Sequence, residues 1–197
     1  VKLCIHAGFD VKDISYTPNG VSYSEIIEAK NLGVKITLDN LYSLEKFGTD
    51  FPDYPVAIRM NPHVMAGGNA KISVGHIDSK FGISVSQIEA ILGVVSKTGM
   101  TINGVHMHTG SDISNLEAFV EATEILLGIA RRFKTIEFVD LGSGFKVPYK
   151  PGDNETDLEK LGVLLGDSFN NFCKEYGKEL TLIFEPGKFL VSESGKF

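Results

Sequence analysis

Polar residues that directly follow apolar runs carry the side chains best suited to chemistry in this sequence. The apolar run at 180–184 predicts a buried strand, and Glu185 at its end supplies a carboxylate. Lys188 supplies an ammonium group just after it. His106 and His108 supply two imidazoles, which the two-residue period of a β-strand would place on one face. A carboxylate removed from water needs a cation or a protonated ring nitrogen beside it. These groups together predict a cofactor site.

A glycine-rich segment, Gly142-Ser143-Gly144, follows a second apolar run at 136–141. The amides of a glycine turn can cradle a phosphate, although the same turn is typical of an ordinary strand-to-helix connection. The histidines at 106 and 108 admit three interpretations: buried core residues, a zinc-binding pair, or imidazoles lying against a flat cofactor. The following Thr109-Gly110-Ser111 favours an anion over a metal ion, because it offers a glycine and a hydroxyl group at a strand end.

The segments that must position these side chains alternate between strand-like and helix-like patterns. Runs rich in Val, Ile, Leu, Phe and Thr predict strands at 14–17, 35–38, 56–60, 102–108, 136–141 and 180–184. Helical spacing of apolar residues predicts helices at 22–32, 41–47, 85–98, 116–133 and 158–176. This alternation indicates an α/β protein with a parallel sheet, and strands that are apolar on both faces indicate a sheet covered by helices.

An open doubly wound sheet and a closed (β/α)8 TIM-type barrel both fit this alternation. We favour the barrel because polar residues such as Asn19, Asp39, Arg59 and Asp140 stand near the ends of most predicted strands. A barrel brings all such ends to one rim, where barrel enzymes build their sites. About six strands are predicted where a barrel has eight. We therefore expect residues 1–197 to form one incomplete barrel domain of a longer polypeptide, with its first strands missing.

Composition limits the possible functions. The 197 residues include 43% hydrophobic and 22% charged residues, as in an ordinary globular domain. A net charge of -6 argues against nucleic-acid binding and against an anionic membrane surface, and no apolar run is long enough to span a bilayer. Cys4 and Cys173 lack the spacing of metal ligands, so we expect two reduced thiols in a cytoplasmic protein.

Five motifs together give the sequence a resemblance to a known family. They are Arg59-Met60-Asn61-Pro62, Ser79-Lys80-Phe81-Gly82-Ile83, Gly104-Val105-His106-Met107-His108-Thr109-Gly110-Ser111, Asp140-Leu141-Gly142-Ser143-Gly144-Phe145 and Glu185-Pro186-Gly187-Lys188. Each motif is weak alone, but their order and spacing resemble those of the fold-type III pyridoxal-phosphate decarboxylases across nearly all of the chain. The resemblance implies a (β/α)8 barrel that binds pyridoxal phosphate and is followed in the full protein by a β-domain.

The resemblance also implies roles for particular side chains. His108 would stack on the cofactor ring and Glu185 would pair with its pyridinium nitrogen, so we predict these two residues to be catalytic. Ser111 and the turn Gly142-Ser143-Gly144 would hold the cofactor phosphate. Lys188 stands where the family usually has arginine, and we assign it to the cofactor site. Its ammonium group could meet the phosphate or a substrate carboxylate, without arginine's bidentate fork.

The family pattern is not matched everywhere. Asp112 stands where glutamine is common, and we assign it no role. The lysine that bonds covalently to the cofactor belongs to an early strand that this sequence lacks, so we expect the isolated chain to be inactive. The resemblance implies a small amino-acid substrate and a homodimer. The segment at 61–81 is more similar to the branch that converts meso-diaminopimelate to L-lysine than to the branch that acts on ornithine.

Other functions stay open at this point. Carboxynorspermidine, ornithine or arginine could replace meso-diaminopimelate as the substrate of a related decarboxylase. A metal-dependent barrel hydrolase could use His106, His108, Asp140 and Glu185, although we assign no metal ligand in the preferred hypothesis. A third possibility is a decarboxylase-like regulator that binds partners without catalysing a reaction.

Overall fold

The computed structural model describes residues 1–64, 79–113 and 115–195, and its centre is a single sheet of parallel strands. In spatial order these strands are β1 (Ser15–Tyr16), β2 (Lys35–Leu38), β3 (Val56–Asn61), β5 (Ile102–His106), β6 (Phe138–Asp140) and β7 (Thr181–Ile183), with β4 (Ile83–Ser84) paired to the end of β3. Each pairing is parallel, so the carboxyl ends of neighbouring strands meet at one edge of the sheet.

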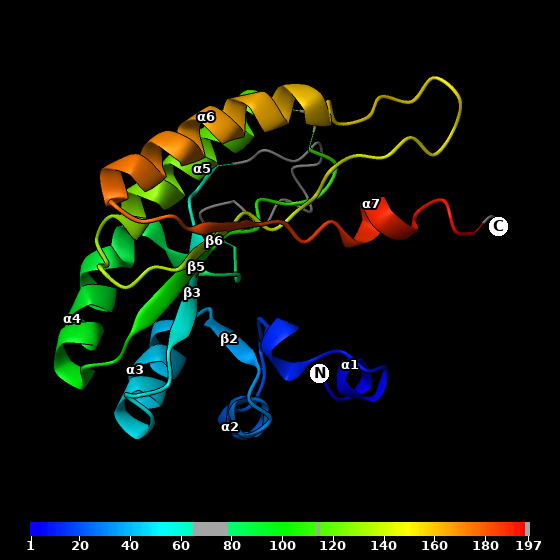
Figure 1. Cartoon of the computed structure of the whole chain (residues 1–197). Helices are drawn as coiled ribbons and strands as arrows, with labels where there is room; N and C mark the ends of the chain where they lie inside the picture. Colours follow the sequence, from blue (N-terminus) through cyan, green and yellow to red (C-terminus); the bar gives the residue numbers. More distant parts are fainter. Residues whose placement is uncertain (65–78, 114, 196–197) are drawn as a thin grey trace.

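Helices alternate with the strands along the chain. The α-helices are α1 (Lys2–His6), α2 (Tyr23–Asn31), α3 (Leu41–Asp50), α4 (Ile88–Thr98), α5 (Leu116–Ala130), α6 (Leu158–Tyr176) and α7 (Gly187–Val191), and two 3-10 turns are η1 (Val11–Asp13) and η3 (Val85–Gln87). Figure 1 shows α2 to α6 following one another in an arc around the strands, with α7 on the opposite side. This arrangement confirms the predicted α/β class, as part of a barrel whose helices form the outer layer.

Local sequence signals explain where the main helices begin and end. Asn40 caps α3, because its side chain accepts a hydrogen bond from the Ser43 amide at 2.8 Å. Asp157 caps α6 in the same way, with the Lys160 amide at 2.9 Å. Gly99 and Gly177 end α4 and α6 in the left-handed conformation that only glycine adopts freely. These caps fix where the helices begin or end.

The predicted elements differ from the observed ones mainly at their ends. The strand at 102–108 ends two residues early, at His106, and the helix at 85–98 begins as the 3-10 turn η3. The two-residue strand β4 was not predicted, because so short a pair carries no readable period. The choice between family branches used the segment at 61–81. Residues 65–78 of that segment are outside the described part of the chain.

The core lies between the sheet and the arc of helices. All six residues of β3 are buried, and side chains such as Ile58, Val105 and Val139 are fully removed from water. The prediction that Glu185 ends a buried strand is wrong, since β7 is half-exposed along its length. Its exposure follows from its place at the end of the strand order, where β6 is its only neighbour among the described strands. In the described residues, no helix has the length and apolar character to cross a membrane.

Candidate active site

The carboxyl ends of five strands carry ionisable side chains that meet at one rim. Asp39 follows β2, Arg59 lies near the end of β3, His106 ends β5, Asp140 ends β6 and Glu185 comes just after β7. Contacts between these residues, described below, show that the parallel strands bring them together, as the sequence predicted. The rim of a β/α barrel is the usual position for an active site.

His106 and Asp140 form the buried centre of this rim. The two residues occupy paired register positions on β5 and β6, and they are 2% and 5% exposed. The His106 Nδ1 atom lies 3.3 Å from Asp140 Oδ2. The other oxygen, Asp140 Oδ1, accepts a hydrogen bond from the Gly142 amide at 2.8 Å. Asp140 therefore ties the imidazole to the start of the glycine turn.

The Glu185 carboxylate approaches the same pair. One side-chain ligand atom from each of His106, Asp140 and Glu185 lies within 4.8 Å of the other two. Although Glu185 as a whole residue is exposed, removal of water from its carboxylate and the presence of Asp140 raise its pKa above the ordinary value. His106 and Arg59 act in the opposite direction and favour the charged carboxylate. The backbone fixes its position, since the Glu185 amide donates to Gly142 O at 2.7 Å.

Arg59 lies close enough to two acids of the rim to feel their charges. Its side chain is 9% exposed, and its guanidinium carbon lies 4.9 Å from the centre of the Phe81 ring. Burial lowers the pKa of Arg59, while the charges of Asp39 and Glu185 favour its charged form. The Asn19 side chain in turn donates a hydrogen bond to Asp39 at 2.5 Å. Asn19 and Asp39 therefore lie together at the rim, as expected from their positions after predicted strands.

His108 lies two residues beyond β5 and faces the glycine turn. Its Nδ1 atom accepts a long hydrogen bond from the Ser143 amide, at 3.4 Å. Burial, with a further contribution from the charge of Arg59, lowers the pKa of His108 to about 4. The imidazole is therefore neutral near neutral pH. Because Nδ1 accepts a hydrogen bond, the neutral ring carries its proton on Nε2.

The turn at Gly142-Ser143-Gly144 packs so closely on the loop after β5 that it requires glycine. Gly142 and Gly144 have φ angles of +63° and +123°. A Cβ atom on Gly142 would lie 2.5 Å from Met107 O, and one on Gly144 would lie 2.0 Å from Gly110 O. Two amides of the turn are already engaged, by Asp140 and by His108. The turn thus has a packing role that the sequence did not reveal.

Lys188 lies beside Ser111, as the prediction of a common anion site requires, but it also has an acidic partner. Its Nζ atom is 3.4 Å from Ser111 Oγ and 2.5 Å from Asp112 Oδ1. Sequence reasoning missed Asp112. A signal was present in the sequence, because an acid next to a predicted anion-binding serine would attract any ammonium group brought there.

The donor set suits a flat, phosphorylated, nitrogen-containing ring. The described residues offer a cation beside a hydroxyl group, Lys188 and Ser111, an acid, Glu185, and the neutral imidazole of His108. Within the described residues, Thr109 Oγ1 is buried without a hydrogen-bond partner, and so is His106 Nδ1, whose contact with Asp140 Oδ2 at 3.3 Å is not a hydrogen bond. Buried polar atoms of this kind are uncommon and mark a place where a ligand or water completes the structure. The residues therefore fit pyridoxal phosphate.

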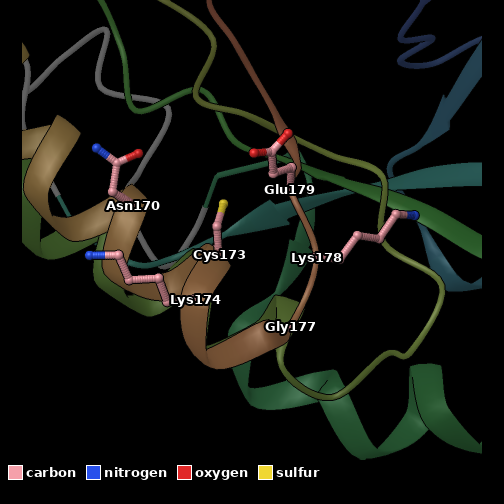
Figure 2. Close-up of a pocket in the computed structure, with 6 residues that line it drawn as sticks. All are labelled: Asn170, Cys173, Lys174, Gly177, Lys178 and Glu179. Carbon is pink, nitrogen blue, oxygen red and sulfur yellow. The ribbon is translucent and has the colours of Figure 1, made fainter.

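A separate pocket of about 500 Å³ lies at the other end of β7. Figure 2 shows its lining residues on the last two turns of α6 and on the segment that leads into β7: Asn170, Cys173, Lys174, Gly177, Lys178 and Glu179. It shares no residue with the rim. Because it lies toward the amino end of β7, away from the edge where barrel enzymes work, we assign the rim and not this pocket as the candidate site.

The fold and the rim together define a β/α-barrel protein of the vitamin B6 class, and comparisons with known proteins make the family explicit. The family model for the pyridoxal-dependent decarboxylases, pyridoxal binding domain, matches residues 1–192. This chain belongs to that family.

Individual relatives agree with the family model. Diaminopimelate decarboxylase of Streptomyces coelicolor is 32% identical over 190 residues, which are 95% of this chain and 43% of the relative. The enzyme of the same name from Methanothermobacter thermautotrophicus is 31% identical over 195 residues, 95% of this chain and 46% of the relative. The chain spans a little under half the length of these curated relatives.

A solved structure supports the same relationship. The crystal structure of diaminopimelate decarboxylase from Helicobacter pylori, complexed with L-lysine, matches 98% of this chain and 50% of its own, with a TM-score of 0.84 and 26% identity. The fold is also shared with the arginine decarboxylase of Paramecium bursaria Chlorella virus, at a TM-score of 0.70. The match to about half of each solved chain agrees with an incomplete barrel.

Three residues of the metal-hydrolase alternative do lie together. His106, Asp140 and Glu185 could offer one nitrogen and two carboxylate oxygens to a metal ion. His108, the fourth residue of that hypothesis, is not part of this group, and its Nδ1 atom accepts from the Ser143 amide. Membership of a pyridoxal-dependent family favours the cofactor over the metal ion.

Proposed function

We propose that this chain forms the cofactor-binding part of a pyridoxal-phosphate-dependent carboxy-lyase that converts meso-diaminopimelate to L-lysine, a step of lysine biosynthesis. The curated relatives above carry the name diaminopimelate decarboxylase, and a related structure was solved with L-lysine. The observation that carries the proposal is the grouping of Glu185 with His106 and Asp140 on a rim that also holds Lys188 beside Ser111. That grouping offers an acid and an anion site from different strand ends.

The chain's own residues would bind and orient the cofactor. When bound, pyridoxal phosphate supplies a ring that accepts the electrons of the breaking bond between the α-carbon and the carboxylate. Glu185 would hold a proton on the ring nitrogen, because a carboxylate beside that nitrogen raises its pKa. Arg59 and His106 favour the ionised form of Glu185 that this role requires, although burial and Asp140 raise its pKa overall.

His108 and the phosphate-binding residues would fix the ring in place. The neutral imidazole of His108 offers a flat surface without adding a positive charge next to a pyridinium. Ser111, Lys188 and the end of the turn at Gly144 would anchor the phosphate, because the Gly142 and Ser143 amides already donate to Asp140 and His108. Two fixed points and a supporting face hold a flat ring in one orientation, and this keeps the scissile bond aligned with the ring's π-system.

Carbon dioxide release by the full protein that contains this chain tests the proposal. The protein is loaded with pyridoxal phosphate and assayed on meso-diaminopimelate, carboxynorspermidine, ornithine and arginine. We expect meso-diaminopimelate to have the highest kcat/KM and L-lysine to be its product. Preference for another of the four amino acids would change the substrate but keep the class of reaction.

Cofactor and metal content separate the remaining alternatives. Stoichiometric zinc without bound pyridoxal phosphate would support the metal-dependent hydrolase, and bound cofactor without carbon dioxide release from any substrate would support the regulator.

Glu179 offers a matched control for Glu185, because it is an exposed glutamate at the opposite end of β7. Glu179→Gln should leave the assay unchanged.

We also propose that the full protein is a cytoplasmic homodimer. The family resemblance supports the dimer, and two free cysteines in the chain agree with a reducing compartment. Light scattering of the purified protein measures the assembly directly, and a monomeric mass at assay concentration would contradict it.

A further inference from the structure

The geometry points to Asp112 as an internal competitor of the cofactor phosphate: its carboxylate holds the Lys188 ammonium group, which must leave Asp112 to bind the phosphate. This inference rests on the proposed function, in which Lys188 and Ser111 form the anion site. It assigns to Asp112 the control of how tightly that site binds phosphate.

The contact between the two side chains is direct. Lys188 Nζ lies 2.5 Å from Asp112 Oδ1 and only 3.4 Å from Ser111 Oγ, so the stronger of its two contacts is with the acid. The Lys188 and Asp112 side chains are 32% and 39% exposed, which leaves the pair accessible to a ligand in solution. An anion that reaches Ser111 therefore meets an ammonium group whose charge is already neutralised.

The backbone holds Asp112 in this position at a conformational cost. Asp112 has a φ angle of +56°, in the left-handed region that most non-glycine residues avoid and that aspartate and asparagine tolerate best. Two nearby residues of the loop lie against Gly144: the Ile113 amide donates to Gly144 O at 2.8 Å, and Gly110 O is so close that a Cβ atom added to Gly144 would lie 2.0 Å from it. These contacts restrain the backbone of the loop and keep the Asp112 side chain within reach of Lys188.

The chemistry of lysine explains why a single acid is enough to regulate this site. An ammonium group is a compact point charge, whereas arginine presents a planar fork that can bind two partners at once. Lys188 must therefore divide one charge between the Asp112 carboxylate and the ligand. Loss of the acid frees the whole charge for the phosphate.

Binding measurements on the full protein test the inference, with pyridoxal phosphate, inorganic phosphate and pyridoxal as three separate probes. Asp112→Asn removes the negative charge but keeps a residue that tolerates a positive φ angle, so the loop should keep its shape. Because a partly exposed ion pair is weak, we expect Asp112→Asn to tighten binding of both phosphate-containing probes by about two- to fivefold. Binding of pyridoxal, which lacks the phosphate, should not change.

A second variant shows whether the effect passes through Lys188. Lys188→Met should weaken binding of both phosphate probes. In the double variant, Asp112→Asn should produce no tightening relative to Lys188→Met alone. Weaker or unchanged phosphate binding by Asp112→Asn would overturn the inference, as would equal tightening with and without Lys188. Failure of the wild-type protein to bind pyridoxal phosphate while it still binds inorganic phosphate would overturn the proposed function instead, and the inorganic phosphate series would still decide the role of Asp112.

Discussion

His106 and Asp140 lie side by side at paired positions of β5 and β6, with Nδ1 and Oδ2 separated by 3.3 Å. The pair sits where an acid from the next strand end, Glu185, can join it. Asp140 has a second task, because its other oxygen accepts the Gly142 amide. One buried carboxylate thus serves both the acidic end of the rim and the glycine turn.

Removing this carboxylate should destabilise the fold unless its oxygen is replaced. Asp140→Ala leaves the buried Gly142 amide without an acceptor, and we expect a loss of about 1–3 kcal/mol in the free energy of unfolding. Asp140→Asn retains an oxygen at the same place and should cost less. Denaturant unfolding of both variants measures the difference, and equal losses would show that the hydrogen bond to Gly142 contributes little.

Glu185→Gln should separate catalysis from cofactor binding. The amide keeps the size of the side chain but cannot hold a proton on the ring nitrogen by its charge, so we expect turnover in the full protein to fall about 100-fold. Pyridoxal phosphate content should stay near the wild-type level, since the phosphate contacts are untouched. Measured kcat and the absorbance of bound cofactor give the two readouts. An unchanged kcat would remove Glu185 from the mechanism.

The depressed pKa of His108 predicts a loss of stability in acid. The folded pKa is about 4, against an ordinary value of 6.5, so the unfolded chain binds the proton first as the pH falls. The contribution of His108 to folding is fully present above the unfolded value and declines as the pH falls toward the folded one. Between about pH 7 and about pH 5, this linkage should lower the free energy of unfolding by about 2 kcal/mol.

A variant without the imidazole isolates this effect. In His108→Gln the decline between the two pH values should be smaller by roughly the same amount. The raised pKa of Glu185 works in the opposite direction and is present in both proteins, so it cancels in the comparison. Parallel pH dependence in the two proteins would contradict the burial of a neutral His108. The same variant should also retain less cofactor after dialysis.

A methyl group at Gly144 should be poorly tolerated. The added Cβ would lie 2.0 Å from Gly110 O, on a residue whose φ angle is +123°. Steric overlap and backbone strain together should cost about 3 kcal/mol or more. Gly128→Ala is the matched control, because Gly128 lies in α5 with nothing within 4 Å of an added Cβ, and it should stabilise the helix by about 0.5–1 kcal/mol.

Much of the fold could be predicted because its signals are local. The helix at 158–176 and the strand at 35–38 match the structure at both ends, since helical spacing and caps mark the first and a compact apolar run marks the second. Parallel order then brings Asp39, Arg59, His106, Asp140 and Glu185 to one rim. These residues could be found because each one directly follows or ends an apolar run.

The remaining features depend on contacts between distant segments. The sequence shows an acid next to Ser111, but it does not show that Lys188 will reach Asp112, because the two meet only when α7 folds against the loop after β5. The engagement of the turn amides by Asp140 and His108 also arises from neighbouring strands. The exposure of β7 was missed because an apolar strand at the edge of a sheet reads the same as a central one.

The contact of Gly110 O with Gly144, together with the bridge between Ile113 and Phe145, joins the loop after β5 to the turn after β6. The two segments are in effect a single rigid clamp, and neither can shift alone without breaking that bridge. Any rearrangement that admits or releases a ligand should therefore displace both together, and hydrogen exchange should report one shared opening event for the two segments.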